Sequence, residues 1–372
     1  MNIGLITTLD TNIGDDFIRL GIQRVLRQAF PGAEPQWEMV NKHRPETVWP
    51  AWHPARRLPA WAPAWRRAAR AWGGSRFHGC DLVVQCGAPV IWRHCARCEW
   101  NVPLWQEVVG ELHRRIPVLN LAIGTAYPLS AVPDRIDDER DRAYLRAILG
   151  YCRLTTARDA LARRLAAELG TEIPLIPCSA GLAFEVPEAE AGGDLVLVNY
   201  MPKGGHYDFN RDIDEAAWDG VLAEVLSRLA PAFHVVFLCH DRREEALAGA
   251  RFPQYERRRP DTPAAYAALA RQAALGLFNR LHAAVAFAGM GIPSVAVGND
   301  TRLGMVAEYG LPVFDVRTCT AEAVLAAFTD LARRRSAERL RLLALRAEIQ
   351  QQYEQAVGAA WRAGADMVPD GK

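Results

Sequence analysis

The sequence predicts an α/β protein built from two doubly wound, Rossmann-like domains that face each other across a cleft, followed by a C-terminal helix. Short apolar runs alternate with helical patterns in two successive blocks, which is typical of parallel sheets covered by helices. The acidic segment EVPEAEAGG at residues 185–193 separates the blocks and is typical of a linker. We therefore expect domains over residues 1–185 and 194–335 and a final helix over residues 336–364.

Composition excludes several classes of protein. The chain has 372 residues, half of them hydrophobic, which is enough for two domains with full cores. Its net charge of +1 argues against a general nucleic-acid binder. No apolar stretch is long enough to span a membrane, and the first apolar run, residues 3–9, is too short for a secretory signal. Several of the eight cysteines lie in apolar, strand-like runs, so we expect a reduced, cytoplasmic protein.

In the first block, residues 1–7 predict a buried strand and residues 15–30 a helix. Asp15 and Asp16 stand at the start of this helix, where the helix dipole favours acidic side chains. Arg158 lies in a later turn between a strand and a helix. The other strands expected in this block cover residues 81–85, 118–122, 154–156 and 173–176.

Residues 49–72 interrupt this block with five tryptophans among five arginines and four prolines. Such a segment either packs irregularly on its domain or forms a lid, a partner surface or a patch for the membrane interface. Indole and guanidinium groups are also suited to stack on a sugar or on a lipid-linked acceptor.

The second block repeats the alternation. A glycine-rich polar loop containing His206 follows its first strand, and His240 stands at the end of the second. The tail is a long helix rich in Arg, Glu and Gln, which we expect to cross back onto the first domain. The expected strands cover residues 194–200 and 234–239, and the expected helices residues 216–229 and 263–271.

The stretch over residues 276–311 predicts strand, helix, strand, loop and helix in turn. Asn279 is a good N-cap, and Arg280 and His282 follow it in the first helical turn. The second helix begins near Arg302. Ligands of open parallel sheets bind beyond the carboxyl ends of the strands, and helix N-termini favour anions. This edge of the sheet is therefore predicted to bind a small, highly charged anion.

The segment RLH at 280–282, followed by Gly-Ile-Pro and by DTR at 300–302, resembles the polysaccharide pyruvyl transferase family. NIGD at 12–15 and ARD at 157–159 resemble further motifs of that family. The resemblance covers roughly residues 1–311. It implies a two-domain architecture like that of the GT-B glycosyltransferases.

The resemblance implies that phosphoenolpyruvate (PEP) donates its three-carbon skeleton to two hydroxyls of a sugar, which forms a cyclic ketal and releases phosphate. The residue types suit this reaction, because PEP carries a carboxylate and a phosphate, which guanidinium groups bind well. His282 is the candidate acid, its pKa lowered by the helix dipole and raised again by a bound dianion. Asp15 is the candidate base. The donor-binding candidates are Arg158, Arg280 and Arg302, and the acceptor-binding candidates are Asn12, Asp16, His206 and His240.

Two alternatives stay open. The first is a GT-B-type glycosyltransferase that uses a nucleotide sugar, in which the same cleft would hold a diphosphate. The second is an inactive, glycan-binding or complex-forming relative. The Trp/Arg segment favours this second alternative, as do departures from the family motifs, such as Arg302 where lysine is usual.

Cys95 and Cys98 form a single CxxC pair near His94, which is weak support for zinc. We expect no metal and no bound cofactor, with PEP as the donor substrate. The expected partner is a sugar or lipid-linked glycan precursor of exopolysaccharide or cell-surface glycan biosynthesis. A lipid-linked acceptor would bring the protein to the inner membrane face as a peripheral protein. The sequence assigns no oligomeric state.

Overall fold

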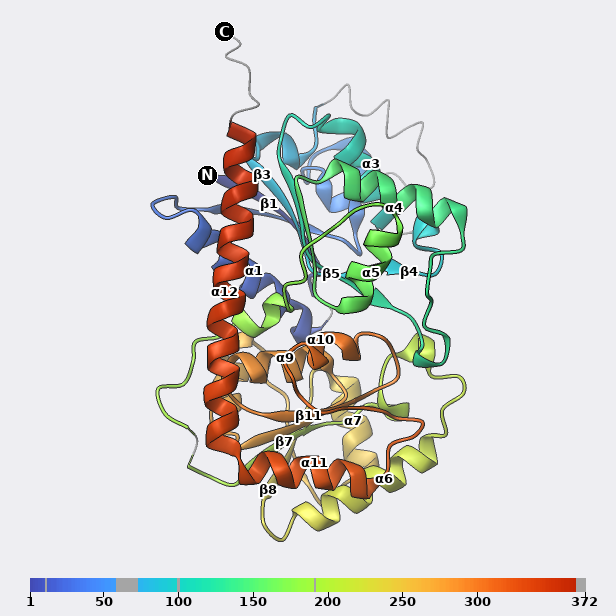
Figure 1. The fold of residues 1–372 in the computed structure, drawn as a ribbon, viewed down its shortest axis with the longest axis vertical. Helices are drawn as coiled ribbons and strands as arrows, with labels where there is room; N and C mark the ends of the chain where they lie inside the picture. The colour runs from blue at the N-terminus through green and yellow to red at the C-terminus, as the bar shows by residue number, and fades with distance from the viewer. Residues whose placement is uncertain (11, 58–72, 99–100, 191, 366–372) are drawn as a thin grey trace.

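The computed structural model describes residues 1–10, 12–57, 73–98, 101–190 and 192–365. The described strands form two six-stranded parallel sheets, one from each half of the chain, with helices packed on them (Figure 1). The predicted α/β fold class is therefore confirmed. No helix in the described part of the chain is long and apolar enough to cross a membrane.

The N-terminal sheet has the strand order β2-β1-β3-β5-β4, and β6 pairs with β5. Its central strands β1 and β3 are almost entirely buried, which explains their apolar sequences. Edge strand β2 is only half-buried. The strands are β1 (Asn2–Thr7), β2 (Gln36–Asn41), β3 (Leu82–Cys86), β4 (Pro89–Trp92), β5 (Val118–Ala126) and β6 (Leu154–Ala157). The helices are α1 (Ile13–Ala29), α3 (Asn101–Glu111), α4 (Glu139–Tyr151) and α5 (Ala160–Glu168).

The C-terminal sheet has the order β12-β11-β10-β7-β8-β9, which is the doubly wound order of dinucleotide-binding folds. The winding reverses between the neighbours β7 and β10, and such switch points form the ligand crevice of open sheets. The strands are β7 (Leu195–Asn199), β8 (His234–Leu238), β9 (Glu256–Arg258), β10 (Leu275–Phe278), β11 (Ser294–Gly298) and β12 (Val313–Asp315). The helices are α6 (Glu215–Leu229), α7 (Arg242–Arg251), α8 (Pro263–Ala270), α9 (Leu281–Gly289), α10 (Leu303–Ala307) and α11 (Ala321–Arg333).

Short 3₁₀ helices connect many of these elements. They are η1 (Pro45–Val48), η2 (Pro54–Arg57), η4 (Arg76–Gly79), η5 (Cys95–Arg97), η6 (Leu129–Ala131), η7 (Ser179–Leu182), η8 (Pro202–Gly204) and η9 (Tyr207–Phe209). The strand expected at residues 173–176 is absent as such, because only Leu175 forms an isolated bridge there, to Ala157.

The two halves share a core around α1, α9, η7 and the long helix α12 (Arg335–Ala365), which runs along one side of both halves (Figure 1). Glycine permits the closest approaches: a Cβ on Gly289 would lie 1.8 Å from the carbonyl oxygen of Gly181. Arg346 of α12 donates hydrogen bonds to the carbonyls of Gly181 (2.8 Å) and Gly289 (2.7 Å). The tail helix therefore crosses back onto the first half, as its sequence predicts.

A second connection between the halves joins the loops that follow β5 and β11. The backbone N–H of Thr301 donates to the carbonyl of Tyr127 (2.9 Å), and the Thr125 hydroxyl donates to that of Thr301 (2.9 Å). Pro128 and Asp300 form an isolated antiparallel bridge. The carboxyl edges of the two sheets are therefore held face to face.

The described part of the Trp/Arg segment, residues 49–57, packs on the N-terminal half. Trp49 is fully buried and stacks on His53 at 4.5 Å between ring centroids, whereas Trp52 is 69% exposed. Residues 58–72, which carry the other three tryptophans, lie outside the described residues.

Candidate active site

The facing edges of the two sheets enclose a cavity of about 270 Å³. It is lined from the N-terminal half by the start of α1 and from the C-terminal half by the loops after β7, β8, β10 and β11. All predicted site residues except Arg158 and Asp16 line it, namely Asn12, Asp15, His206, His240, Arg280, His282 and Arg302.

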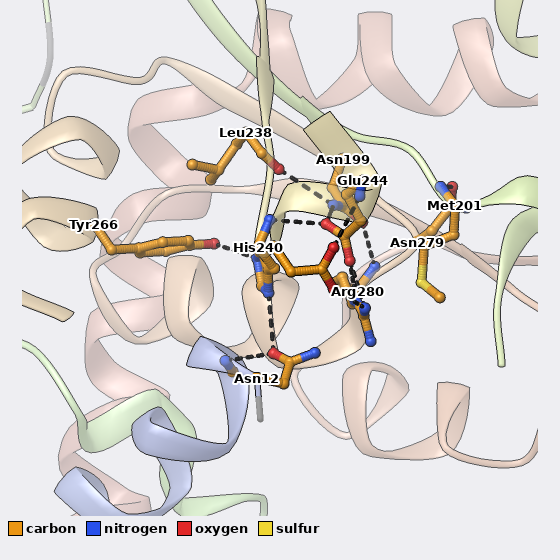
Figure 2. A network of polar contacts seen from close by, with 11 residues as sticks. Asn12, Asn199, Met201, Leu238, His240, Glu244, Tyr266, Asn279 and Arg280 are labelled. Carbon is orange, nitrogen blue, oxygen red and sulfur yellow. Dashed lines mark hydrogen bonds and ion pairs between the residues drawn. The ribbon is translucent and has the colours of Figure 1, made fainter. Parts of the chain in front are cut away.

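Two buried asparagines hold together the strand ends at the switch point (Figure 2). The Asn199 side chain, at the end of β7, accepts from the backbone N–H of Arg280 (2.9 Å) and donates to Glu244 (2.8 Å). The Asn279 side chain, after β10, accepts from the N–H of Met201 (2.9 Å). The position of Asn279 in the sequence suggested that it is the N-cap of α9. It is not, because its side-chain amide bonds to backbone groups of neighbouring loops. Arg280 takes the cap position without a side-chain cap.

Arg280 is held by acidic side chains of the C-terminal half (Figure 2). Its guanidinium contacts Glu244 at 2.5 Å and Asp241 at 3.5 Å. The Glu244 carboxylate is almost completely buried and also accepts from the His240 backbone N–H (2.8 Å). Burial raises the pKa of Glu244, and the charge of Arg280 opposes this rise. The positive charge of Arg280 is therefore compensated before any ligand binds.

Arg302 is compensated in the same way by its neighbour Asp300. One Asp300 oxygen accepts from the Arg302 backbone N–H (2.9 Å) and Nε (2.8 Å), and the other accepts from a terminal guanidinium nitrogen (2.8 Å). Burial acts to raise the pKa of Asp300, yet the charge and hydrogen bonds of Arg302 hold it below its ordinary value. Helix α10 begins here but has only five residues, so it adds little of the dipole effect expected from the sequence.

His282 meets an arginine from the opposite half of the molecule. Nη1 of Arg158 lies 3.3 Å from Nε2 of His282. Because arginine only donates, Nε2 of His282 is the acceptor, and the proton of the neutral ring is on Nδ1. Burial, followed by the charges of Arg158 and Arg302, lowers the pKa of His282 well below its ordinary value. This cause differs from the helix dipole proposed from the sequence.

Arg158 is completely buried at the turn between β6 and α5. Its Nε and Nη2 atoms have no hydrogen-bond partner within the described residues. The nearby Cys178 thiol stays neutral, because burial raises its pKa. A Cβ on Gly124 would lie 2.4 Å from the Arg158 Nε, so glycine at this position makes room for the guanidinium. Arg158 is thus a buried cation that makes no ion pair within the described residues and has two nitrogens free to donate.

His240 connects the two halves of the site (Figure 2). Its Nδ1 lies 3.3 Å from Oδ1 of Asn12, and its Nε2 lies 3.2 Å from the Tyr266 hydroxyl. Asn12 Oδ1 also accepts from the backbone N–H of Gly14 (2.7 Å), and so caps α1. Burial, followed by the charge of Arg280, lowers the pKa of His240 well below its ordinary value. Both ring nitrogens are thus engaged by protein atoms.

The adjacent acids Asp15 and Asp16 have different surroundings. The Asp15 carboxylate faces the cavity and makes no hydrogen bond or ion pair within the described residues. Asp16 pairs with Arg19 at 2.6 Å and lines neither this cavity nor the one beside it. The geometry therefore favours Asp15 as the acid that can reach a substrate.

A larger cavity of about 1250 Å³ adjoins the first and shares Asp15, His206 and Arg302 with it. Its walls include the aromatic side chains of Trp92, Tyr127 and Phe209. Burial, followed by the charge of Arg302, lowers the pKa of His206 to about 4, so this histidine is neutral at the junction.

Lys42 also lines the larger cavity, and the sequence analysis missed it. It is the first residue after β2, a strand that was not predicted because only its end is buried. The signal was weak, because QWEMVN has no continuous apolar run to mark it as a strand whose end lies at the carboxyl edge of a sheet.

Of the CxxC pair, Cys98 lines the larger cavity, whereas Cys95 is buried and does not. Burial raises the pKa of Cys95 to about 12, so its thiol is a poor metal ligand. Among the described residues, His94, Asp138 and Asp141 form a group that could hold a metal. Asp141 already accepts from the backbone N–H of His94 (2.7 Å), and Asp138 caps α4. These carboxylates therefore have structural partners.

The family model of polysaccharide pyruvyl transferase matches residues 12–301 of this chain, which is most of its length. The chain belongs to the polysaccharide pyruvyl transferase family. The match begins at the Asn12 cap and ends one residue before Arg302, so it spans both sides of the cavity. The family predicted from the sequence motifs is confirmed. No curated protein sequence was found to match the chain.

Solved structures resemble this member of the pyruvyl transferase family in fold. UDP-GlcNAc 2-epimerase from Neisseria meningitidis has a TM-score of 0.56 at 9% identity, covering 96% of this chain and 99% of that one. A putative UDP-N-acetylglucosamine 2-epimerase from Listeria monocytogenes has 0.53 at 12% identity, covering 92% and 90%. The glycotransferase of kitacinnamycin has 0.50 at 15% identity, covering 97% of each chain. These likenesses confirm the predicted GT-B-like fold.

Proposed function

We propose that this pyruvyl transferase uses PEP as donor and forms a cyclic ketal on two hydroxyls of a saccharide, releasing phosphate. The observation that carries the proposal is the pair of Arg158 and His282. A cation from one half contacts a neutral histidine from the other, at a cavity of about 270 Å³ that suits a small anion. Arg280 and Arg302 line this cavity from the C-terminal half.

The chemistry follows from the protonation state of His282. A bound PEP anion would raise the pKa of this histidine, which burial and cations now depress, so that it takes up a proton. Transfer of that proton to the methylene carbon of PEP makes a methyl group and an oxocarbenium-like centre. The first acceptor hydroxyl adds to this centre and loses its proton to Asp15. The second hydroxyl then displaces the phosphate, which leaves with the remaining proton.

The acceptor is assigned to the larger cavity, since it shares Asp15 with the smaller one and has aromatic walls. Acceptor hydroxyls there would reach the PEP carbon from the side of Asp15 and His206. A glycan precursor of exopolysaccharide or cell-surface glycan biosynthesis fits this family. PEP is made inside the cell, so the reaction belongs in the cytoplasm, and a lipid-linked acceptor would bring the enzyme to the inner membrane face.

Thermal stability with and without PEP tests the donor site directly. A ligand that binds only the native state, at about 100 times its Kd, stabilises it by about 2.7 kcal/mol. We expect PEP to raise the melting temperature of the wild type and to have little effect on Arg158→Ala and Arg302→Ala. Arg251→Ala is the matched control for Arg302→Ala, because Arg251 is also ion-paired, to Glu215 at 2.8 Å, but lies in neither cavity.

The likeness to enzymes named for UDP-sugars supports one second candidate, a nucleotide-sugar transferase. Stabilisation by UDP but not by PEP would favour it. Stabilisation by neither, together with no release of phosphate from PEP across a panel of saccharides, would favour the glycan-binding relative.

A further inference from the structure

The charges around the smaller cavity are unevenly compensated. Arg280 and Arg302, from the C-terminal half, each hold a buried carboxylate at 2.5–2.8 Å. A PEP anion would have to share these arginines with Glu244 and Asp300. Within the described residues, Arg158 of the N-terminal half makes no ion pair, so that half is the place to look for further cations.

Lys42 comes from the same N-terminal half as Arg158. Its backbone N–H donates to the carbonyl of Thr7 (2.8 Å), which fixes the residue at the carboxyl edge of the sheet, next to the end of β1. Its side chain lines the larger cavity together with Asp15 and Arg302, which also line the smaller one. Among the residues that the structure describes, the Lys42 ammonium has no hydrogen bond and no ion pair.

Lys42 shares the wall of the larger cavity with Asp15 and Arg302, and charges of the donor site act on it. Burial lowers the pKa of Lys42, the charge of Asp15 opposes this, and the charges of Arg158 and Arg302 lower it further. The charge of Lys42 in turn contributes to the lowered pKa of His282. Asp15 offsets only part of the repulsion among these cations, and a bound anion would relieve the rest.

We propose that the Lys42 ammonium, on the wall of the larger cavity where it adjoins the smaller one, is a donor-binding group that, together with Arg158, holds the phosphate of PEP from the N-terminal half of the cleft. This assignment rests on the proposed function. In this assignment, the cations without ion pairs come from the N-terminal half. Arg280 and Arg302, whose guanidinium groups are held by carboxylates, orient the anion. The chain has only three lysines, Lys42, Lys203 and Lys372. A compact ammonium suits a site shared with a departing phosphate, since it binds as a point charge.

The experiment compares Lys42→Met and Lys42→Arg with the wild type. Lys203→Met is the matched control, because Lys203 lines neither cavity and its ammonium donates to the carbonyl of Asn210 at 3.3 Å. We measure the melting temperature without ligand, with PEP and with inorganic phosphate, and the KM values for PEP and for the acceptor. Loss of a hydrogen bond to a charged group predicts a KM for PEP about 10- to 100-fold higher in Lys42→Met.

A specific pattern supports the assignment. Lys42→Met should keep or raise the melting temperature of the ligand-free protein, because repulsion among the cations is relieved. It should reduce the shifts caused by PEP and by phosphate and leave the KM for the acceptor unchanged. Lys42→Arg, which restores the charge, should recover part of the shift with PEP. A purely structural lysine would instead lower the melting temperature without ligand.

Other outcomes overturn the assignment. If PEP stabilises Lys42→Met as much as the wild type, Lys42 does not hold the donor, although the proposed function stands. If only the KM for the acceptor rises, Lys42 serves the acceptor. If phosphate stabilises wild type and Lys42→Met equally, the assignment fails even where PEP itself does not bind. If neither anion stabilises the wild type, the proposed function fails together with the assignment.

Discussion

On the C-terminal side of the cleft, Arg280 and Arg302 are held by buried carboxylates, whereas on the N-terminal side Arg158 and Lys42 make no ion pair within the described residues. The first pair is fixed in position and nearly neutral in sum. In the second pair, the charge of Asp15 acts on Lys42 without forming an ion pair with it. The difference indicates two roles. The C-terminal side fixes the position of a bound anion, and the N-terminal side attracts it.

The two sides of the cleft meet at His282, so a substitution there is expected to have the largest effect. His282→Gln keeps a side chain that can hydrogen-bond to Arg158 but cannot deliver a proton at neutral pH. We expect the rate of ketal formation to fall about 10²- to 10⁴-fold, the usual contribution of a general acid. Phosphate release from PEP in the presence of an acceptor measures this.

His234→Gln is the control for that experiment, since His234 is exposed and stands at the distant end of β8. If His282→Gln retains more than a tenth of the wild-type rate, another group supplies the proton.

On the C-terminal side, Glu244→Gln removes the counter-charge of Arg280, and so tests whether the two sides differ in charge compensation. Breaking a buried ion pair leaves an uncompensated charge, and we expect a loss of about 3 kcal/mol in the free energy of unfolding. Urea unfolding measures this change. Arg158→Met, on the N-terminal side, removes a cation that makes no ion pair within the described residues and should cost much less. Equal losses in the two variants would show that both sides are equally well compensated.

The pH dependence of stability distinguishes the ligand-free site from the occupied one. In the native state, the pKa of His206 is about 4, and those of His240 and His282 are well below their ordinary value of 6.5. The unfolded chain therefore binds more protons below pH 6.5. The stability from these three histidines is fully present above that pH and is lost as the pH falls toward their native values, by up to about 1.4 kcal/mol per pH unit for each.

PEP should counter this loss, because it raises the pKa of His282. The increase in melting temperature caused by PEP is therefore expected to grow between pH 7.5 and pH 6. In His282→Gln the increase should vary less with pH. An increase that shrinks toward pH 6 would mean that PEP binds without protonating this histidine.

A residue of this site could be predicted from the sequence when the interactions that position it involve its neighbours in the chain. Strand β10 and the Arg280–His282 segment were found because a buried apolar run and the motif after it are contiguous in the sequence. The N-cap role predicted for Asn279 was wrong. N-capping depends on neighbours in the sequence, whereas this side-chain amide bonds to Met201, far away in the sequence. The partner of Arg280 was missed for the same reason, since Glu244 is 36 residues away.

Lys42 was missed because β2 lies at the edge of its sheet. A half-buried strand that contains Gln and Glu has no continuous apolar run, and its importance comes from its pairing with β1, which composition does not reveal. The turn before α1 was predicted correctly in place, but Asp15 and Asp16 look alike in the sequence. Only their surroundings separate them, and these depend on which way the first turn of α1 faces.

Substitution of each acid in turn tests the difference between Asp15 and Asp16, and the effect at Asp16 is expected to be the smallest. Asp16→Asn removes a partly exposed ion pair with Arg19 and should change stability by less than about 1 kcal/mol, with no change in rate. Asp15→Asn removes a carboxylate that faces both cavities without a partner in the described residues, and should lower the rate about 100-fold with little change in stability. The two variants have the same chemistry at adjacent positions, so a rate loss in Asp16→Asn but not in Asp15→Asn would move the candidate base by one residue and turn the assigned acceptor path to the other face of α1.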